Sequence, residues 1–308
     1  GADGWRLDVA DELPDWFLEK IRAAMEETAP DSVLIGEVWE DGSTKVAYGV
    51  RRRHILGGHC DGLMNYPFRG AALAYLRGGD ARDFMEAMET LRENYPRFAF
   101  YSAMNALGTH DTPRILTLLG VGNECRDRSR EWRSSFRMDP DQRRRGKELL
   151  KLGAALLFAF PGSPTVYYGD EAGMEGFEDP FNRRTYPWGR EDGELLEWYT
   201  ALGKARRALP ALRRGELELY RAIREAVPIV DAAILKLIRL VGGVEVEVPL
   251  LGQLLQHGEQ GHGVSPARQG HQDGAAWGEH VVSVGKGRRL GDQINRVLHS
   301  YAPRKRRQ

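Results

Sequence analysis

The sequence predicts an α/β protein whose strands alternate with helices and pair side by side in a parallel sheet. Short runs rich in β-branched residues alternate with longer segments in which apolar residues recur every three or four positions. Strands joined through a helix pair in parallel, so this order is typical of a doubly wound sheet or of a barrel. Neither G-x-G-x-x-G nor G-x-x-x-x-G-K follows a strand, so a nucleotide-binding open sheet loses its main support and the barrel is favoured.

The first strand is expected over residues 4–10, in the opening stretch GADGWRLDVADE. Side chains alternate along a strand, so Arg6 and Asp8 share one face, while three apolar residues share the other face and pack under helices. The apolar residues are Trp5, Leu7 and Val9. An isolated Arg-x-Asp at a strand end is most often a structural ion pair, and only partners elsewhere in the chain change that interpretation.

The remaining elements follow from the same periodicities. A helix is expected over 13–28, because Pro14 is tolerated in a first helical turn and apolar residues recur every four positions. Those apolar residues are Leu13, Phe17, Ile21 and Met25. Further helices are expected over 69–77, over 81–94, from Pro113 onward, through Leu149, Leu152, Leu156 and Phe160, and over 194–209. Further strands are expected over 32–40, 60–68, 101–108 and 165–171, with polar loops over 121–144 and 179–189.

Composition restricts the class of partner. Lysine plus arginine equals aspartate plus glutamate at 44 each, so the charge predicts neither nucleic acid nor an anionic membrane as a partner. No apolar run approaches the roughly 18 residues that cross a bilayer. Cys60 and Cys125 lie far apart without a C-x-x-C pattern. We therefore expect no disulfide framework, no metal site and no cofactor, and the cytoplasm is the preferred compartment.

The composition changes near residue 221. Only two aromatic residues, Trp277 and Tyr301, follow Ala222. Four histidines stand among glycines without the spacing of zinc ligands, so a poorly packed tail is favoured over a metal site. They are His257, His262, His271 and His280. Within this tail a helix is expected over 223–241 and a strand over 244–251.

Three acidic side chains are expected at the carboxyl ends of strands, where α/β barrels place their active sites. Asp8 and Glu37 end the first two strands, and Asp111 follows the strand that ends at Gly108. The 29 residues from Asp8 to Glu37 make one βα repeat. These two side chains are therefore expected to be neighbours around the ring.

Neighbouring carboxyl groups in different protonation states are what glycoside hydrolysis requires. One stays ionised and attacks the anomeric carbon, and Arg6 favours that role for Asp8. The other holds a proton for the leaving oxygen, a role that suits Glu37, which precedes Val38 and Trp39 in a drier setting. The alternative is that the acids cap helices or pair with surface lysines. This structural alternative is disfavoured, because the position, the chemistry and the order of the three acids all agree with a catalytic site.

At these residues the sequence resembles the α-amylase family, glycoside hydrolase family thirteen. DGWRLDVADE, GEVWE and GTHDTPR are similar, in order and spacing, to its second, third and fourth motif regions. LMNYPF and YYGDEAGMEGFEDPFNRRTYPW are similar to the branch of neopullulanases, cyclomaltodextrinases and maltogenic amylases. The resemblance covers about residues 1–220. It implies that residues 1–214 form the C-terminal part of a catalytic (β/α)8 TIM barrel, from strand four to strand eight with their helices.

The resemblance also implies a role for each motif residue. Asp8 matches the nucleophile that forms a covalent glycosyl intermediate, and Arg6 matches the residue that orients it. Glu37 matches the general acid and base. His110 and Asp111 match the pair that binds the sugar hydroxyls where the bond breaks, with Asp111 favouring the distorted transition state.

Three further residues lie outside that group. Asp179 and Arg183 resemble a pair that contacts a more distant glucose residue. Trp39 is either a stacking platform for a sugar face or a packing residue beside the strand. The implied partner is an α-glucan oligosaccharide.

The chain departs from the family pattern at both ends. The motif region that precedes the nucleophile strand in the family has no counterpart here, so the sequence is expected to be a fragment. Five strands cannot close an eight-strand barrel, and two unpaired edges favour pairing with a second copy as a homo-oligomer. Residues 215–308 stand where the family has an aromatic-rich β-sandwich. We interpret them as an atypical tail, disordered or produced by a frame error near residue 222.

Two functions from different classes follow. The first is a retaining hydrolase of α-1,4 bonds in cyclodextrins, pullulan or maltooligosaccharides, with transglycosylation as a side activity. The second is a truncated, non-catalytic remnant that at most binds oligosaccharide, because part of the sugar site comes from strands that this sequence lacks. A nucleotide-dependent oxidoreductase is disfavoured by the missing phosphate loop.

Overall fold

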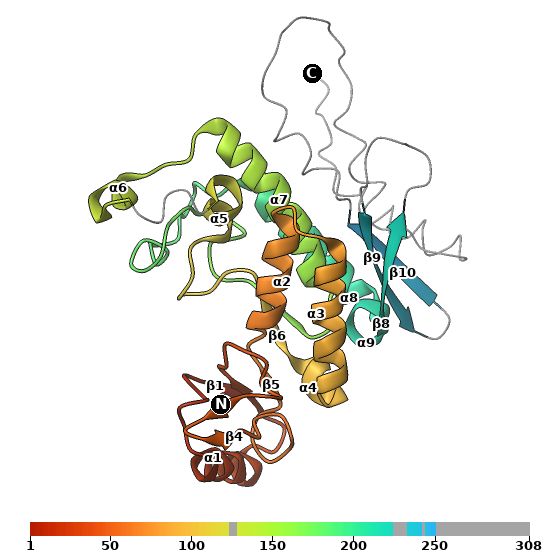
Figure 1. Cartoon of the computed structure of the whole chain (residues 1–308). Coiled ribbons are helices and arrows are strands. Elements are labelled where there is room, and N and C mark those ends of the chain that lie inside the picture. The colour runs from red at the N-terminus through yellow and green to blue at the C-terminus, as the bar shows by residue number, and fades with distance from the viewer. Residues whose placement is uncertain (123–127, 224–232, 242–243, 251–308) are drawn as a thin grey trace, which may run out of the picture.

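The computed structural model describes residues 1–122, 128–223, 233–241 and 244–250, with side chains described as far as Leu217. A parallel sheet with α1 lies at one end of the molecule, a group of helices follows, and an antiparallel sheet lies beside the helices (Figure 1). The predicted α/β class is therefore confirmed.

Five short strands pair in parallel and position the site. They are β1 (Gly4–Leu7), β2 (Val33–Gly36), β5 (Gly62–Leu63), β6 (Met104–Ala106) and β7 (Ser163–Thr165). β2 lies between β1 and β5, β6 pairs with β7, and one parallel bridge between Met64 and Met104 joins the two groups. Leu7 lies opposite Gly36, so the chain leaves β1 and β2 at the same edge of the sheet.

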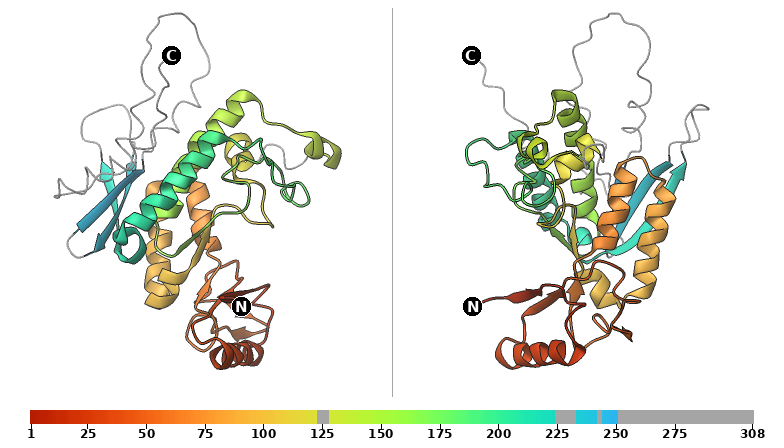
Figure 2. Two further views of the ribbon diagram at one scale, coloured as in Figure 1. Left: turned by 180° about the vertical axis from the view of Figure 1, so that it is seen from behind. Right: turned by 60° about the vertical axis from the view of Figure 1, so that its left-hand side comes forward.

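Helices connect these strands and supply most of the core. They are α1 (Asp15–Thr28), α2 (Tyr66–Leu76), α3 (Ala81–Asn94), α4 (Arg97–Ser102), α5 (Ile115–Val121), α6 (Arg130–Ser135), α7 (Pro140–Ala159), α8 (Gly193–Ala208) and α9 (Pro210–Arg214). Both views of Figure 2 keep the red α1 and the first strands at one end and the green α7 and α8 at the other. The helices expected over 13–28, 81–94 and 194–209 are confirmed.

Side-chain caps explain where three of these helices begin. Asn65 accepts a hydrogen bond from the backbone N–H of Phe68, Asp139 forms a capping box at the start of α7, and Asp192 caps α8. Because Asn65 starts α2 at Tyr66, the strand expected over 60–68 shortens to β5.

Other expected boundaries are also wrong. The strand expected over 165–171 ends at Thr165, because the chain turns through a left-handed Gly169 (φ 86°). The loop expected over 121–144 contains α6 and the first turn of α7. The first two residues of the strand expected over 101–108 belong instead to the end of α4. On α1, the predicted Met25 is buried and the predicted Ile21 packs against the core, but Phe17 is exposed and Leu18 is buried in its place.

β1 differs from its prediction. The strand ends at Leu7, because Val9 has a left-handed backbone (φ 40°) that leaves the pleat. Trp5 is 60% exposed and Val9 is 46% exposed, and of the three apolar residues only Leu7 packs against the core. The reason is that β1 is an edge strand of the described sheet, with an open hollow between Trp5, Leu7 and α1.

An antiparallel sheet follows the helices, and a small hairpin lies outside both sheets. The strands are β8 (Glu216–Ile223), β9 (Ala233–Val241) and β10 (Val244–Leu250) in the sheet, and β3 (Val46–Ala47) and β4 (Val50–Arg51) in the hairpin. The strand expected over 244–251 is confirmed. The helix expected over 223–241 is wrong over β9, because β8 and β10 pair with both of its edges.

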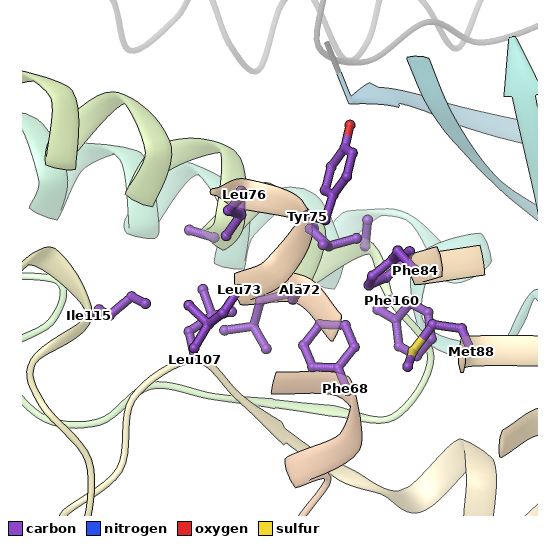
Figure 3. Packing of buried hydrophobic residues seen from close by; sticks show 14 of the residues in the cluster. Phe68, Ala72, Leu73, Tyr75, Leu76, Phe84, Met88, Leu107, Ile115 and Phe160 are labelled. Atoms are coloured by element: carbon purple, nitrogen blue, oxygen red, sulfur yellow. The ribbon is translucent and has the colours of Figure 1, made fainter. Parts of the chain in front are cut away.

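The helical core contains a cluster of aromatic rings (Figure 3). Phe68 of α2 packs against Phe160 with ring centroids 4.8 Å apart and against Phe84 of α3 at 6.3 Å. Phe160 follows α7, so this cluster joins three helical segments that are far apart in the sequence. Leu107 and Ile115, on either side of the His110 turn, belong to the same core.

Among the described residues, no helix is both long enough and apolar enough to cross a bilayer. Cys60 is a buried free cysteine. Cys125 and the four tail histidines lie outside the described residues.

We expect Phe68→Ala to lower the free energy of unfolding by about 3–5 kcal/mol, because it removes a fully buried ring from the cluster. Chemical denaturation measures the change. Phe17→Ala is the matched control, since it deletes the same atoms from an exposed position and should cost about 1 kcal/mol or less. Equal losses in the two variants would contradict this account of the core.

His54 provides a second test. Its side chain is fully buried, both ring nitrogens lack a hydrogen-bond partner, and burial lowers its pKa to about 4. The unfolded chain therefore binds a proton that the folded chain excludes, so stability is lost as the pH falls from 6.5 to about 4.

We expect that loss to reach at most about 3 kcal/mol and to be reduced in His54→Leu. Urea denaturation of both proteins at pH 7.5 and pH 4.5 measures the difference. Parallel losses in the two proteins would show that His54 does not contribute.

Candidate active site

The carboxyl ends of β1 and β2 bring three charged side chains together. The backbone N–H of Glu37 donates to the carbonyl of Leu7 at 3.0 Å, and the N–H of Ala10 donates to the carbonyl of Glu37 at 3.0 Å. These bonds extend the pairing past the ends of both strands. Arg6, Asp8 and Glu37 consequently lie on one side of the sheet edge.

The Arg6 guanidinium lies between the two carboxylates. Its Nη1 is 2.5 Å from Asp8 Oδ1, and its Nη2 is 2.8 Å from Glu37 Oε1. The backbone N–H of Val9 donates to Glu37 Oε2 at 2.9 Å. Each oxygen of Glu37 therefore faces a donor, and the predicted neighbourhood of Asp8 and Glu37 is confirmed.

The two carboxylates have different surroundings. The Asp8 side chain is 75% exposed, and the hydrogen bond from Arg6 holds the pKa of this carboxyl below its ordinary value of 3.8. Glu37 and Val38 are buried, as the expectation of a drier setting requires. Asp8 is thus an accessible, ionised carboxylate beside a buried one.

A second cluster lies beyond β6. His110 Nε2 is 3.1 Å from Asp111 Oδ2, and Arg183 Nη2 is 3.2 Å from Asp111 Oδ1. Asp179 Oδ2 lies 3.2 Å from the same Arg183 nitrogen. The charge of His110 also contributes to lowering the pKa of Asp8, so the two clusters lie within electrostatic reach of each other.

The structure shows that Trp39 is a packing residue that also keeps part of its surface exposed. Its ring stacks on Tyr66 with centroids 4.2 Å apart and planes 10° apart, yet the residue remains 47% exposed. Burial raises the pKa of Tyr66, and the charges of Glu37 and Asp111 add to that effect. Tyr66 therefore lies near both clusters, although only its place in LMNYPF singled it out in the sequence.

Sequence reasoning missed Asn182. This fully buried side chain donates from Nδ2 to the carbonyl of His110 at 2.7 Å and to that of Thr112 at 2.9 Å. Both carbonyls flank Asp111, so Asn182 holds the turn that presents it. The available signal was its position between Asp179 and Arg183.

A metal centre was not expected, and the described residues contain no group of three histidine, cysteine, aspartate or glutamate side chains able to hold a metal ion. The chemistry that these residues can perform is acid and base work by paired carboxyl groups, next to donors that can bind hydroxyls.

Comparison with known proteins decides the family. A family model of the α-amylase catalytic domain matches residues 1–208. The chain belongs to the α-amylase family. Its resemblance to that family, and to cyclomaltodextrinases and neopullulanases within it, is therefore confirmed.

Several α-amylase family relatives match at moderate identity. An amylopullulanase of Thermoanaerobacter thermohydrosulfuricus is 35% identical over 234 residues, which cover 72% of this chain and 15% of that protein. A cyclomaltodextrinase of Geobacillus thermopakistaniensis is 33% identical over 234 residues, covering 75% and 34%. The chain thus spans well under half the length of these relatives.

A solved structure has the same fold over most of this chain. It is a cyclic α-maltosyl-(1→6)-maltose hydrolase from Arthrobacter globiformis in complex with cyclic α-maltosyl-(1→6)-maltose. The TM-score is 0.64 at 27% identity, and the match covers 81% of this chain and 48% of that one.

We expect Arg6→Gln to raise the pKa of Asp8 toward 3.8, because the substitution removes the guanidinium that stabilises the charged carboxylate. Carboxyl-carbon NMR titration measures the change. Arg183→Gln is the control, since Arg183 contacts Asp111 and Asp179. An Asp8 titration that Arg6→Gln leaves unaltered would contradict the assigned contact.

Proposed function

We propose that this chain carries the catalytic site of a retaining α-glucan hydrolase that cleaves α-1,4 bonds. The observation that carries the proposal is the Arg6 guanidinium in contact with Asp8 and Glu37 at 2.5 and 2.8 Å. A double displacement at an anomeric carbon requires two carboxyl groups close together, and a guanidinium in contact with both holds them in that way.

Asp8 acts as the nucleophile. In the first step one of its oxygens attacks the anomeric carbon, the bond from that carbon to the leaving oxygen breaks, and Glu37 gives its proton to that oxygen. In the second step Glu37 takes a proton from water, and the water oxygen replaces Asp8 on the anomeric carbon. The low pKa of Asp8 supports the first role, because the nucleophile must be ionised.

Glu37 acts as the general acid and base. Both of its oxygens face donors, the Arg6 guanidinium and the Val9 N–H. A leaving oxygen must therefore take the place of one of these contacts. Since Arg6 also contacts Asp8, its guanidinium can stay with the nucleophile when Glu37 turns to the substrate.

The second cluster binds the sugar. His110 and Asp111 contact hydroxyls at the point of cleavage, with Asp111 favouring the distorted transition state, while Asp179 and Arg183 contact a more distant glucose residue. The contacts between Arg183 and both acids support their joint action. Trp39 supplies its exposed ring face for stacking on a sugar, because the other face is occupied by Tyr66.

The sheet order supports the finer fold assignment. β1, β2, β5, β6 and β7 would be strands four to eight of a (β/α)8 barrel, in residues 1–214, with 215–308 as an atypical tail. The exposed edge of β1 favours self-association in solution. Cyclodextrins, pullulan and maltooligosaccharides are the proposed substrates, since some relatives are named cyclomaltodextrinase and neopullulanase.

A second candidate function is oligosaccharide binding without turnover. The exposure of Asp8 favours it, because a nucleophile open to water lacks the dry surroundings that strengthen electrostatic catalysis. Hydrolysis and binding are therefore measured separately.

We expect the purified chain to hydrolyse β-cyclodextrin and an aryl maltoside, and Asp8→Asn and Glu37→Gln each to lower turnover by about a thousandfold or more. The first-formed sugar should keep the α configuration, which proton NMR detects. Asp31→Asn is the matched control, since this exposed carboxylate precedes β2 and lies away from the site.

Two further measurements identify binding without turnover. Titration with maltose gives the affinity of the site, and a thermal melt shows whether the chain is folded. A folded chain that binds maltose without turning over either substrate would favour the second function. Turnover that survives both site variants would contradict the assigned roles.

A further inference from the structure

Arg114 and Asp170 form a buried ion pair that sequence reasoning did not single out. Arg114 Nη1 lies 3.2 Å from Asp170 Oδ1, and both side chains are almost completely excluded from solvent. The two residues are 56 positions apart. Arg114 ends the THDTPR motif, and Asp170 lies in the turn after β7.

The pair is enclosed by rings and by a close backbone approach. The Arg114 guanidinium lies 4.2 Å from the ring centroid of Tyr167 and 4.6 Å from that of Tyr168. It also donates to the carbonyl of Tyr168. A Cβ atom on Gly108 would lie 2.3 Å from Asp170 Oδ2, so only glycine at that position leaves room for the carboxylate.

Arg114 also lies at the junction of the two segments that form the sugar-binding cluster. Its backbone N–H donates to the carbonyl of Gly176 at 3.0 Å. His110 and Asp111 lie in the turn just before it, and Asp179 and Arg183 lie in the loop just after Gly176. The His110 turn therefore meets this loop at the backbone of Arg114, while the Arg114 side chain meets the turn after β7.

We propose that the Arg114–Asp170 pair is a positioning device that sets the His110–Asp111 turn against the loop of Arg183. The inference rests on the proposed function and extends it to two residues that do not touch the substrate. The pair fixes the turn to the core and thereby sets the contact between Asp111 Oδ1 and Arg183 Nη2, which are 3.2 Å apart.

Burying an ion pair is a poor way to gain stability, which supports a role in geometry. Two guanidinium nitrogens of Arg114, Nε and Nη2, have no hydrogen-bond partner. Burial raises the pKa of Asp170 to about 7 even beside Arg114. Apolar residues of similar volume would avoid both costs, whereas a guanidinium directed at one carboxylate and one carbonyl specifies a single arrangement.

The test compares two carboxylate-to-amide changes in one loop. At a pH well above the Asp170 pKa of about 7, Asp170→Asn removes the negative charge that faces Arg114. Glu175→Gln is the matched control, since Glu175 pairs with Arg143 of α7 and lies five residues along. We expect Asp170→Asn to lower kcat on an aryl maltoside about a hundredfold with little change in KM, and Glu175→Gln to leave both nearly unchanged.

Replacements of Arg114 separate position from packing. Arg114→Lys keeps the charge and should retain at least tenfold more kcat than Arg114→Met, which keeps only the apolar stem. Equal kcat values for Lys and Met, or equal losses in Asp170→Asn and Glu175→Gln, would overturn the proposal. These comparisons use temperatures at which thermal melts show every variant folded, and Arg114→Met replaces Asp170→Asn should the latter not fold.

Hydrogen exchange decides the inference even without turnover. We expect Asp170→Asn to speed exchange at least tenfold in the peptide 110–118 and to leave the peptide of α1 unchanged. An unaltered peptide 110–118 would overturn the positioning role. A chain that shows the exchange effect but hydrolyses nothing would instead reject the proposed hydrolysis and keep the pair as the element that orders the turn.

Discussion

The site depends on one guanidinium placed between two carboxylates. Arg6 pairs in register with Ile35, so the side chains two positions further along, Asp8 and Glu37, leave on the same face of the sheet as Arg6. A slip of one residue between β1 and β2 would turn Glu37 to the other face. The ion pairs at 2.5 and 2.8 Å therefore follow from strand register.

The remaining site residues depend on polar contacts between loops. Asn182 bonds to two carbonyls of the His110 turn, Arg183 contacts Asp111, and Arg114 reaches the turn after β7. Active-site residues are often found on loops that a packed scaffold positions, because the sequence of a loop can vary without disturbing the core. Here Leu107 and Ile115 anchor the turn in the aromatic core, so the core determines where Asp111 can lie.

Much of the fold follows from periodicity. The helices over 13–28, 81–94 and 194–209 were predictable because their apolar stripes are long. The short strands were less so, since β5 and β7 have two and three residues and a cap or a left-handed glycine determines where they end. β9 shows the same limit, because its conformation comes from pairing with β8 and β10.

The sequence by itself determined which acidic residues stand at the ends of strands. Asp8, Glu37 and Asp111 follow strands in a fixed order, and barrel chemistry gathers at strand ends, so their proximity could be predicted. Only the tertiary structure decided that Arg6 also contacts Glu37, that Trp39 stacks on Tyr66 and that Arg114 meets Asp170. These partners lie 27 to 56 residues apart, and no local periodicity encodes which side chains packing brings into contact.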